Sequence, residues 1–102
     1  MIKKTFKVVI RKENEKSLRE VKGYFTWLND LRVFIYYDFT YRLWYVIDLD
    51  TGLSISCGHS MAEAKKSTIE RLELFKNIKK DKKYNTYKFQ YQKMLKEERN
   101  EV

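Results

Sequence analysis

Residues 32–58 carry the pattern that most constrains the fold, because three short runs typical of β-strands are separated by turn residues. The first run is β-branched and aromatic, the second places Leu43, Tyr45, Ile47 and Leu49 on one face, and the third alternates with Leu53, Ile55 and Cys57 inward. The expected strands are residues 32–38, 42–49 and 53–58. Two expected turns separate them, Asp38-Phe39-Thr40 and Asp50-Thr51-Gly52, and Gly52 supplies the positive φ angle of a short hairpin loop. The stretch predicts a three-stranded antiparallel meander.

The N-terminal third divides into an expected strand and an expected helix. Residues 2–11 alternate with a basic outer face and predict a further strand. Residues 14–30 change period and predict an amphipathic helix, with Asn14 as its N-cap and Gly23 weakening its centre by about 1 kcal/mol relative to Ala. The apolar stripe of this helix consists of Leu18, Val21, Phe25 and Leu28.

The C-terminal part predicts two helices. Ser60 and Glu63 have the spacing of a capping box, which opens a helix over about residues 61–78. Tyrosines at helical spacing predict a second helix over about residues 82–98, and the lysine-rich run 76–83 becomes a solvated joint between the two. We therefore predict one α+β domain over residues 1–102, ordered strand, helix, three strands and two helices. Its antiparallel sheet would have about four strands, its helices would pack mainly on one face, and a basic helical extension would begin near residue 76.

The net charge of +8 is sorted along the chain. Residues 1–22 carry eight Lys or Arg against three Glu, a net of +5, and residues 76–102 carry nine against four acids, again +5. Residues 23–64 carry two Arg against five acids, a net of −3. Basic ends favour a polyanionic partner, which could be nucleic acid, an anionic membrane or an acidic protein.

These charges define the candidate nucleic-acid-binding residues, although lysine runs can equally serve as solvated faces. The candidates are Lys3, Lys4, Lys7, Arg11, Lys12, Lys65, Lys66, Lys76, Lys79, Lys80, Lys82 and Lys83. Phosphate contacts from such residues would make binding steeply dependent on salt.

Three aromatic residues form the candidate partner-binding surface. Phe34, Tyr36 and Trp44 share one sheet face in a simple register, opposite a face that contains Tyr45 and Ile47. A helix could cover these aromatics, they could contact a partner protein, or they could stack nucleic-acid bases. All three alternatives stay open at this point.

The residue types of catalysis are sparse. Cys57 and His59 share a strand face, but the alternation favours Cys57 in the core beside Ile55 and no third group orients the pair. Asp48 and Asp50 flank a turn, where aspartates serve the hairpin. A chain with one Cys and one His offers no transition-metal ligand set. We expect no enzyme, no cofactor and no metal.

The location follows from what the chain lacks. No run reaches the ~18–20 apolar residues of a membrane span, and Met1-Ile2-Lys3-Lys4 shows no apolar region of a signal peptide. We expect a cytoplasmic protein of a bacterial host cell with no membrane partner. The absence of proline and the wealth of Lys, Tyr, Asn and Ile resemble low-GC bacterial or phage coding.

Residues 44–66 resemble parts of known families. Trp44-Tyr45-Val46, Asp50-Thr51-Gly52-Leu53 and Gly58-His59-Ser60-Met61-Ala62-Glu63-Ala64-Lys65-Lys66 are similar to the end of a double-stranded-RNA-binding domain. They are also similar to HicB-type antitoxins, whose strand–turn–strand closes with Gly-x-Ser/Thr-x-x-Glu-Ala. The chain further resembles small proteins of Gram-positive phages and mobile elements, some of which inhibit CRISPR nucleases.

The resemblance and the charges together give the functional hypothesis. We expect a non-enzymatic phage or mobile-element inhibitor of the anti-CRISPR or anti-defence type. It would bind a host nucleoprotein complex, such as a CRISPR effector, through a basic surface and an aromatic hairpin. The alternatives are an independent nucleic-acid-binding regulator that takes RNA or DNA directly, and an antitoxin-like protein partner. The oligomeric state stays open, a dimer included.

Overall fold

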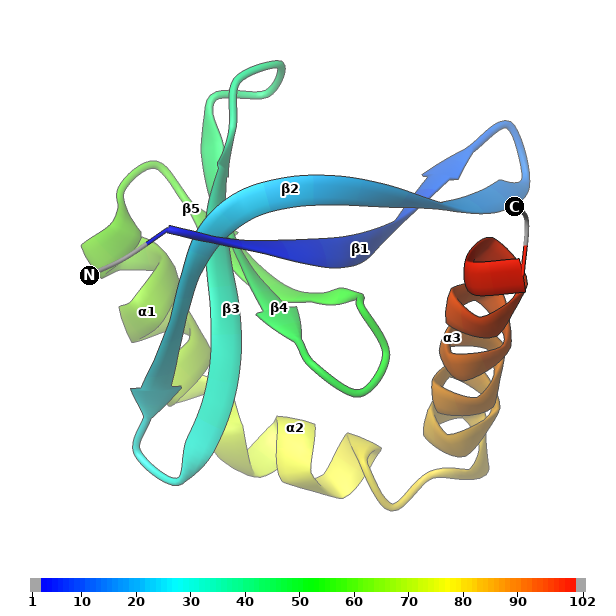
Figure 1. Ribbon diagram of the computed structural model, residues 1–102. Helices are drawn as coiled ribbons and strands as arrows, with labels where there is room; N and C mark the ends of the chain where they lie inside the picture. The colour runs from blue at the N-terminus through cyan, green and yellow to red at the C-terminus, as the bar shows by residue number, and fades with distance from the viewer. Residues whose placement is uncertain (1–2, 101–102) are drawn as a thin grey trace.

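The computed structural model describes residues 3–100, which form an antiparallel sheet followed by three helices (Figure 1). The strands are β1 (Lys4–Lys12), β2 (Glu15–Leu28), β3 (Leu31–Asp38), β4 (Leu43–Asp48) and β5 (Ser54–Gly58). Their order in the sheet is β1-β2-β3-β4-β5, so every strand pairs with its neighbour in sequence. The predicted α+β class and antiparallel sheet are confirmed, but the sheet has five strands where about four were predicted.

The extra strand is β2, and the helix predicted over residues 14–30 is wrong. Lys12 pairs with Glu15, and Glu13 and Asn14 between them have φ angles of 50° and 69°. Two adjacent residues with positive φ match the tight turns that join hairpin strands. Asn14 is thus a turn residue and caps no helix.

Gly23 marks the point where β2 changes partner. It pairs with Lys4 of β1 on one side and with Tyr36 of β3 on the other, where β1 ends and the pairing with β3 begins. A Cβ atom there would lie 2.1 Å from the carbonyl oxygen of Ile35, so only glycine permits this approach. Gly23, which was expected to weaken a helix, instead allows the long strand β2 to bend.

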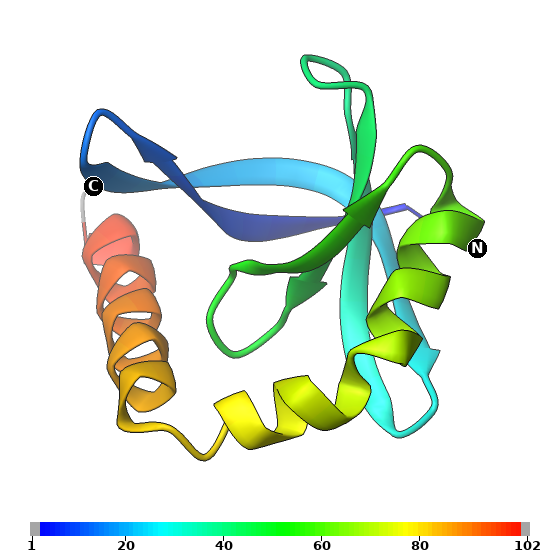
Figure 2. The same ribbon diagram turned by 180° about the vertical axis from the view of Figure 1, so that it is seen from behind.

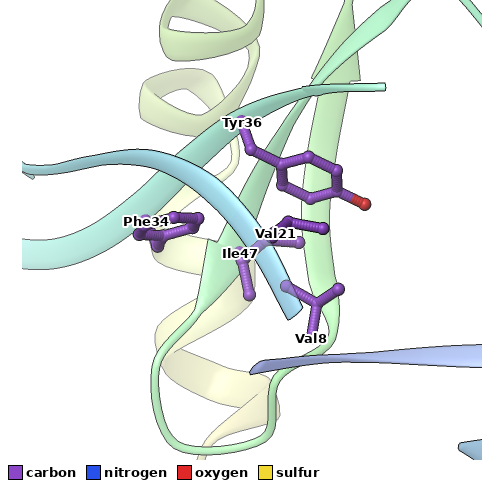
Figure 3. Packing of buried hydrophobic residues seen from close by; sticks show 5 residues of the cluster. All are labelled: Val8, Val21, Phe34, Tyr36 and Ile47. Carbon is purple, nitrogen blue, oxygen red and sulfur yellow. The ribbon is translucent and has the colours of Figure 1, made fainter. Parts of the chain in front are cut away.

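The sheet curls toward one face, which we call the inner face. Val8 of β1 and Ile47 of β4 pack in one cluster although two strands separate them in the sheet order, and the Phe6 ring stacks on the Phe34 ring with centroids 5.1 Å apart. The backbone N–H of Val9 donates to the carbonyl of Gly52 in the β4–β5 turn, which draws β1 toward that turn. Figure 3 shows the cluster, with the hydroxyl of Tyr36 directed away from the other four side chains.

The opposite, outer face carries a second core under α1 (Met61–Glu70). Val33, Ile35 and Val46 are fully buried there against Ala64 of α1. The predicted capping interaction is present in modified form. The backbone N–H of Glu63 donates to Ser60 Oγ at 3.0 Å, and the Glu63 carboxylate accepts from the backbone N–H of His59 at 2.9 Å.

The helices run around the β4–β5 turn, as the reverse view shows (Figure 2). The helix predicted over residues 61–78 is interrupted at Arg71, with φ −104° and ψ 6°, and continues as α2 (Leu72–Ile78). A short joint leads to α3 (Lys82–Asn100). None of the helices within residues 3–100 has the length and apolar character needed to cross a membrane.

Two tyrosines attach α3 to the sheet. The Tyr84 hydroxyl donates to Asp48 Oδ2 at 2.7 Å, and the Tyr91 hydroxyl donates to the carbonyl of Lys7 at 2.6 Å. Gly52 has a φ of +68°, and a Cβ atom there would lie 2.5 Å from the Tyr91 ring. Position 52 therefore needs glycine for two reasons, the positive φ angle of the turn and the close packing of the Tyr91 ring of α3.

Candidate functional site

The β1–β2 hairpin and the β3–β4 hairpin leave the sheet in different directions (Figure 1). Residues of both hairpins line a groove of about 660 Å³. One hairpin contributes cations and the other contributes tyrosines, and we call the site the arginine–tyrosine groove. Its volume falls within the ~300–1,000 Å³ of ordinary ligand sites. The side chains that define it are Arg11, Lys12 and Arg19 on the first hairpin and Tyr36, Tyr41 and Tyr45 on the second.

The aromatic side of the groove follows from strand register. Tyr36 and Tyr45 are direct cross-strand partners, so their rings share the inner face and stack with centroids 5.6 Å apart at 23°. Burial, aided by the nearby Asp38 carboxylate, raises the pKa of Tyr36 to about 12. Burial also raises the pKa of Tyr45, whose side chain stays half-buried. Both hydroxyls are therefore neutral donors at physiological pH.

The basic side of the groove meets the aromatic side at Asp38. One carboxylate oxygen of Asp38 accepts from the backbone N–H groups of Thr40 and Tyr41 at 2.8 and 3.1 Å, which fixes the predicted turn. The other oxygen lies 3.9 Å from the Arg19 guanidinium. That contact is too long for a strong hydrogen bond, so Arg19 keeps donor capacity toward the groove.

The tip of the β3–β4 hairpin presents the most exposed aromatic side chains of this region. Phe39 is 83% exposed and Tyr41 is 70% exposed. Phe39 packs edge-to-face on Tyr37 at 4.9 Å, and Arg42 turns the chain with a φ of 57°. Phe39 was predicted only as a turn residue and Tyr41 was not singled out. The signal available in the sequence was two large aromatic residues in a turn, where small polar residues are usual.

The predicted partner-binding surface needs correction. Phe34 is fully buried and Tyr36 is 7% exposed, and both lie on the inner face because they pair with Ile47 and Tyr45. Trp44 pairs with Tyr37 and lies on the outer face beside the α1 core. The three residues do not share a surface, because a simple register placed Tyr45 and Ile47 on the wrong side relative to Phe34.

Three of the twelve predicted nucleic-acid-binding residues are held by carboxylates. Lys7 bridges Glu20 and Glu98 at 3.2 and 2.5 Å. Lys76 pairs with Asp30 at 3.1 Å, which raises the pKa of the lysine and lowers that of the aspartate through their hydrogen bond. Lys79 lies 3.8 Å from Asp50.

The remaining nine predicted cations lie on several different elements. Arg11 and Lys12 reach the groove from the end of β1. The others belong to the start of the described chain and to α1, which Figure 1 shows on the same side of the molecule, and to the segment around the α2–α3 joint, which lies at its lower edge. These are Lys3, Lys4, Lys65, Lys66, Lys80, Lys82 and Lys83. The structure therefore brings two of the predicted cations to the groove, together with Arg19, which was not predicted.

The expected inward placement of Cys57 is also wrong. The β4–β5 register shifts between Val46 and Ile47, so Ser56 enters the buried outer-face layer and Cys57 is exposed. Ser56 Oγ donates to the carbonyl of Ala64 at 3.1 Å and also bonds Thr68 Oγ1. A bulge of this kind reverses the faces of the residues that follow it.

Asp48 and Asp50 belong to the β4–β5 turn, as the hairpin interpretation expected. Asp48 is 3% exposed and accepts from Thr51 Oγ1 at 2.8 Å and from the Tyr84 hydroxyl. Burial, followed by the hydrogen bond to Asp48, raises the pKa of Tyr84 far above its usual value. Within residues 3–100, no three His, Cys, Asp or Glu side chains gather into a cluster suited to a metal ion.

Comparison with known proteins identifies no relative of this chain. No protein-family model, no curated protein sequence and no solved structure matches the chain significantly. The functional argument therefore depends on the arginine–tyrosine groove and the exposed hairpin tip themselves.

Proposed function

We propose that this chain is a non-enzymatic binding protein that engages a nucleoprotein complex through the arginine–tyrosine groove and the adjoining aromatic tip. The observation that supports this proposal is the meeting of the two features in one place. Arg19 from the basic hairpin lies beside Asp38 at the base of the aromatic hairpin. A surface that offers cations to phosphates and aromatic side chains to protein or bases suits a partner containing both macromolecules.

The biological role we propose is inhibition of a host defence complex, with the chain acting as a phage or mobile-element protein in the bacterial cytoplasm. Its support is the composition and the resemblance of the chain to small phage proteins, together with a binding surface that needs no catalytic group. An inhibitor of this kind acts by occupying its target, so affinity is the property that its surface must supply.

A capture experiment tests the proposal. Tagged full-length chain is incubated with a bacterial host lysate, with and without nuclease, beside the double variant Phe39→Ala/Tyr41→Ala and the control Phe89→Ala. Phe89 is 71% exposed on α3 and does not line the groove, so its variant removes one exposed aromatic ring at another site. We expect a large partner that the control retains and the double variant loses. Equal capture by all three proteins would refute the proposal.

Independent nucleic-acid binding is a second candidate function, favoured by the donor capacity that Arg19 retains. This function predicts that the lysate experiment captures nucleic acid alone, and that nuclease treatment removes all of the captured material. An antitoxin-like role would instead show a small protein partner that survives nuclease treatment.

A further inference from the structure

The arginine–tyrosine groove has the two chemical features that a nucleic-acid strand requires, and we propose that it binds single-stranded nucleic acid. This inference rests on the proposed function, because it names the part of a nucleoprotein that would enter the groove. It goes further in assigning the ligand to a single strand and in giving roles to Tyr41, Tyr45 and Arg19.

The tyrosines supply a stacking surface for bases. Tyr45 is half-buried and supported by the stacked ring of Tyr36, so its orientation is fixed before a ligand arrives. Tyr41 stands 70% exposed at the rim. Bases stack on such rings in single-strand-binding proteins with little dependence on sequence, because every base has a π-face.

The cations supply phosphate contacts at the same place. Among residues 3–100, Arg19 pairs with no carboxylate closer than that of Asp38 at 3.9 Å, and Arg11 and Lys12 are exposed at the end of the hairpin. The groove thus presents three cations against one carboxylate, of which one oxygen already accepts from backbone N–H groups. Lys7 differs from these three cations, because its ammonium group pairs with two glutamates.

The size of the groove favours a single strand over a duplex. A groove of about 660 Å³ has room for the bases and phosphates of a short strand and cannot enclose a double helix. A duplex also keeps its bases stacked on each other, so they are not free to stack on tyrosine. The lysines that could follow a duplex backbone, such as Lys66 and Lys82, lie on helices outside the groove.

Binding of short labelled oligonucleotides to the full-length chain tests the proposal. Fluorescence anisotropy would compare single-stranded RNA, single-stranded DNA and the duplex of the same sequence. We expect at least one of the single strands to bind at least about 10-fold more tightly than the duplex. With three cations, the logarithm of the affinity should fall with that of salt at a slope of about −2. The RNA and DNA arms show which sugar the groove prefers, and preference for either supports the proposal.

Surface variants locate the binding site. Tyr41→Ala should weaken single-strand binding about 10-fold, and Tyr41→Phe, which keeps the ring, should stay within about 2-fold. Arg19→Gln should lower the salt slope by about 1, whereas Lys66→Gln, which removes the same charge from α1, should leave the slope nearly unchanged. Tyr41 and Arg19 are exposed, so their variants should remain folded, and circular dichroism checks this.

Equal affinity for duplex and single strand, or unchanged single-strand affinity in folded Tyr41→Ala, would overturn the proposal. That failure differs from failure of the proposed function. If oligonucleotides do not bind but the lysate experiment still yields a nuclease-resistant partner that depends on Phe39 and Tyr41, the chain binds a nucleoprotein through its protein component. If oligonucleotides bind but no complex is captured, the groove assignment stands without the inhibitor role.

Discussion

The contact between α3 and the sheet, made by Tyr84, Tyr91 and Lys7 and here called the α3 docking region, contains the same residue types as the arginine–tyrosine groove but uses them differently. In the docking region, Tyr84 and Tyr91 are buried and their hydroxyls donate to Asp48 and to the backbone of Lys7. In the groove, Tyr41 and Tyr45 keep exposed surface, and the hydrogen bonds within residues 3–100 include none from their hydroxyls. A tyrosine whose hydroxyl bonds within the protein stabilises the fold, whereas one that keeps surface exposed to solvent is available to a ligand.

The cations of the two regions differ in the same way. Lys7 in the docking region contacts Glu20 and Glu98, and this exposed bridge links β1, β2 and α3. Arg19 in the groove lies 3.9 Å from the Asp38 carboxylate, a longer contact than either contact of Lys7. The role of a basic residue is therefore set by the acids that the fold places beside it, which composition alone does not reveal.

The largest expected effect distinguishes core aromatics from tip aromatics. Phe34→Ala should lower the free energy of unfolding by about 3–5 kcal/mol, because a fully buried ring is replaced by a cavity. Phe39→Ala removes the same side chain from a position that is 83% exposed and should change it by less than about 0.5 kcal/mol. Urea unfolding followed by tryptophan fluorescence measures both.

A small loss in Phe34→Ala, comparable to that in Phe39→Ala, would show that Phe34 does not belong to the core. That result would favour the sequence-based assignment of Phe34 to a partner-binding surface. Equal slopes of the unfolding curves in urea confirm that the same transition is compared.

The next effect concerns the hydrogen bond that attaches α3. Tyr84→Phe removes the donor to Asp48 and should cost about 1.5–3 kcal/mol, since the acceptor is a buried charged group. Tyr87→Phe is the matched control, because Tyr87 lies one turn along α3 with its ring 37% exposed. If the two variants unfold at the same urea concentration, the contact between Tyr84 and Asp48 does not stabilise the fold.

Alkaline pH should weaken both regions through their buried tyrosines. Burial raises the pKa of Tyr36 and Tyr91 to about 12 and that of Tyr84 further, so folding favours the neutral hydroxyls. Stability from these groups is fully present below the unfolded pKa of about 10. It falls between pH 10 and about 12 by up to about 1.4 kcal/mol per pH unit for each tyrosine.

Urea unfolding at a series of pH values, together with the ultraviolet absorbance of tyrosinate, measures this loss. Tyr91→Phe should reduce the steepness of the decline, because one titrating group is removed. A free energy of unfolding that stays constant across this pH interval would contradict the burial of these tyrosines.

The sequence predicted the meander and the starts of α1 and α3, because their signals are local. Gly52 in its turn and Ser60 with Glu63 at the start of α1 take the conformations that their short-range chemistry demands. The strands predicted within residues 32–58 are likewise present as β3, β4 and β5, although β3 is buried on both faces. Such features need no knowledge of distant residues.

β2 was missed because its environment changes along its length. Its first part pairs with β1 and its second part with β3, and both of its faces are partly buried. The apolar residues therefore spread over both faces, and a selection of them imitates a helical stripe. Glu13-Asn14 and the β-branched and aromatic residues after Gly23 carried the opposing signal.

The groove could not be predicted because it is built from residues distant in sequence. Arg19 and Tyr45 meet only because the sheet curls and β2 bends at Gly23. Arg11 and Lys12 were predicted from their charge. No local sequence signal distinguishes them from Lys7, whose charge is paired with Glu20 and Glu98 in the folded chain. Charge along the chain thus identified candidates, and tertiary structure determined which of them are free.

The most direct test of the account is a nuclear magnetic resonance titration of the full-length chain with the tighter-binding short oligonucleotide. It compares the two regions in one sample without any substitution. The account predicts the largest amide shifts at Arg19, Tyr41 and Tyr45, with small shifts along α3. Shifts concentrated instead at Lys80, Lys82 and the rest of the α2–α3 joint would contradict it and would place binding on the lysine run.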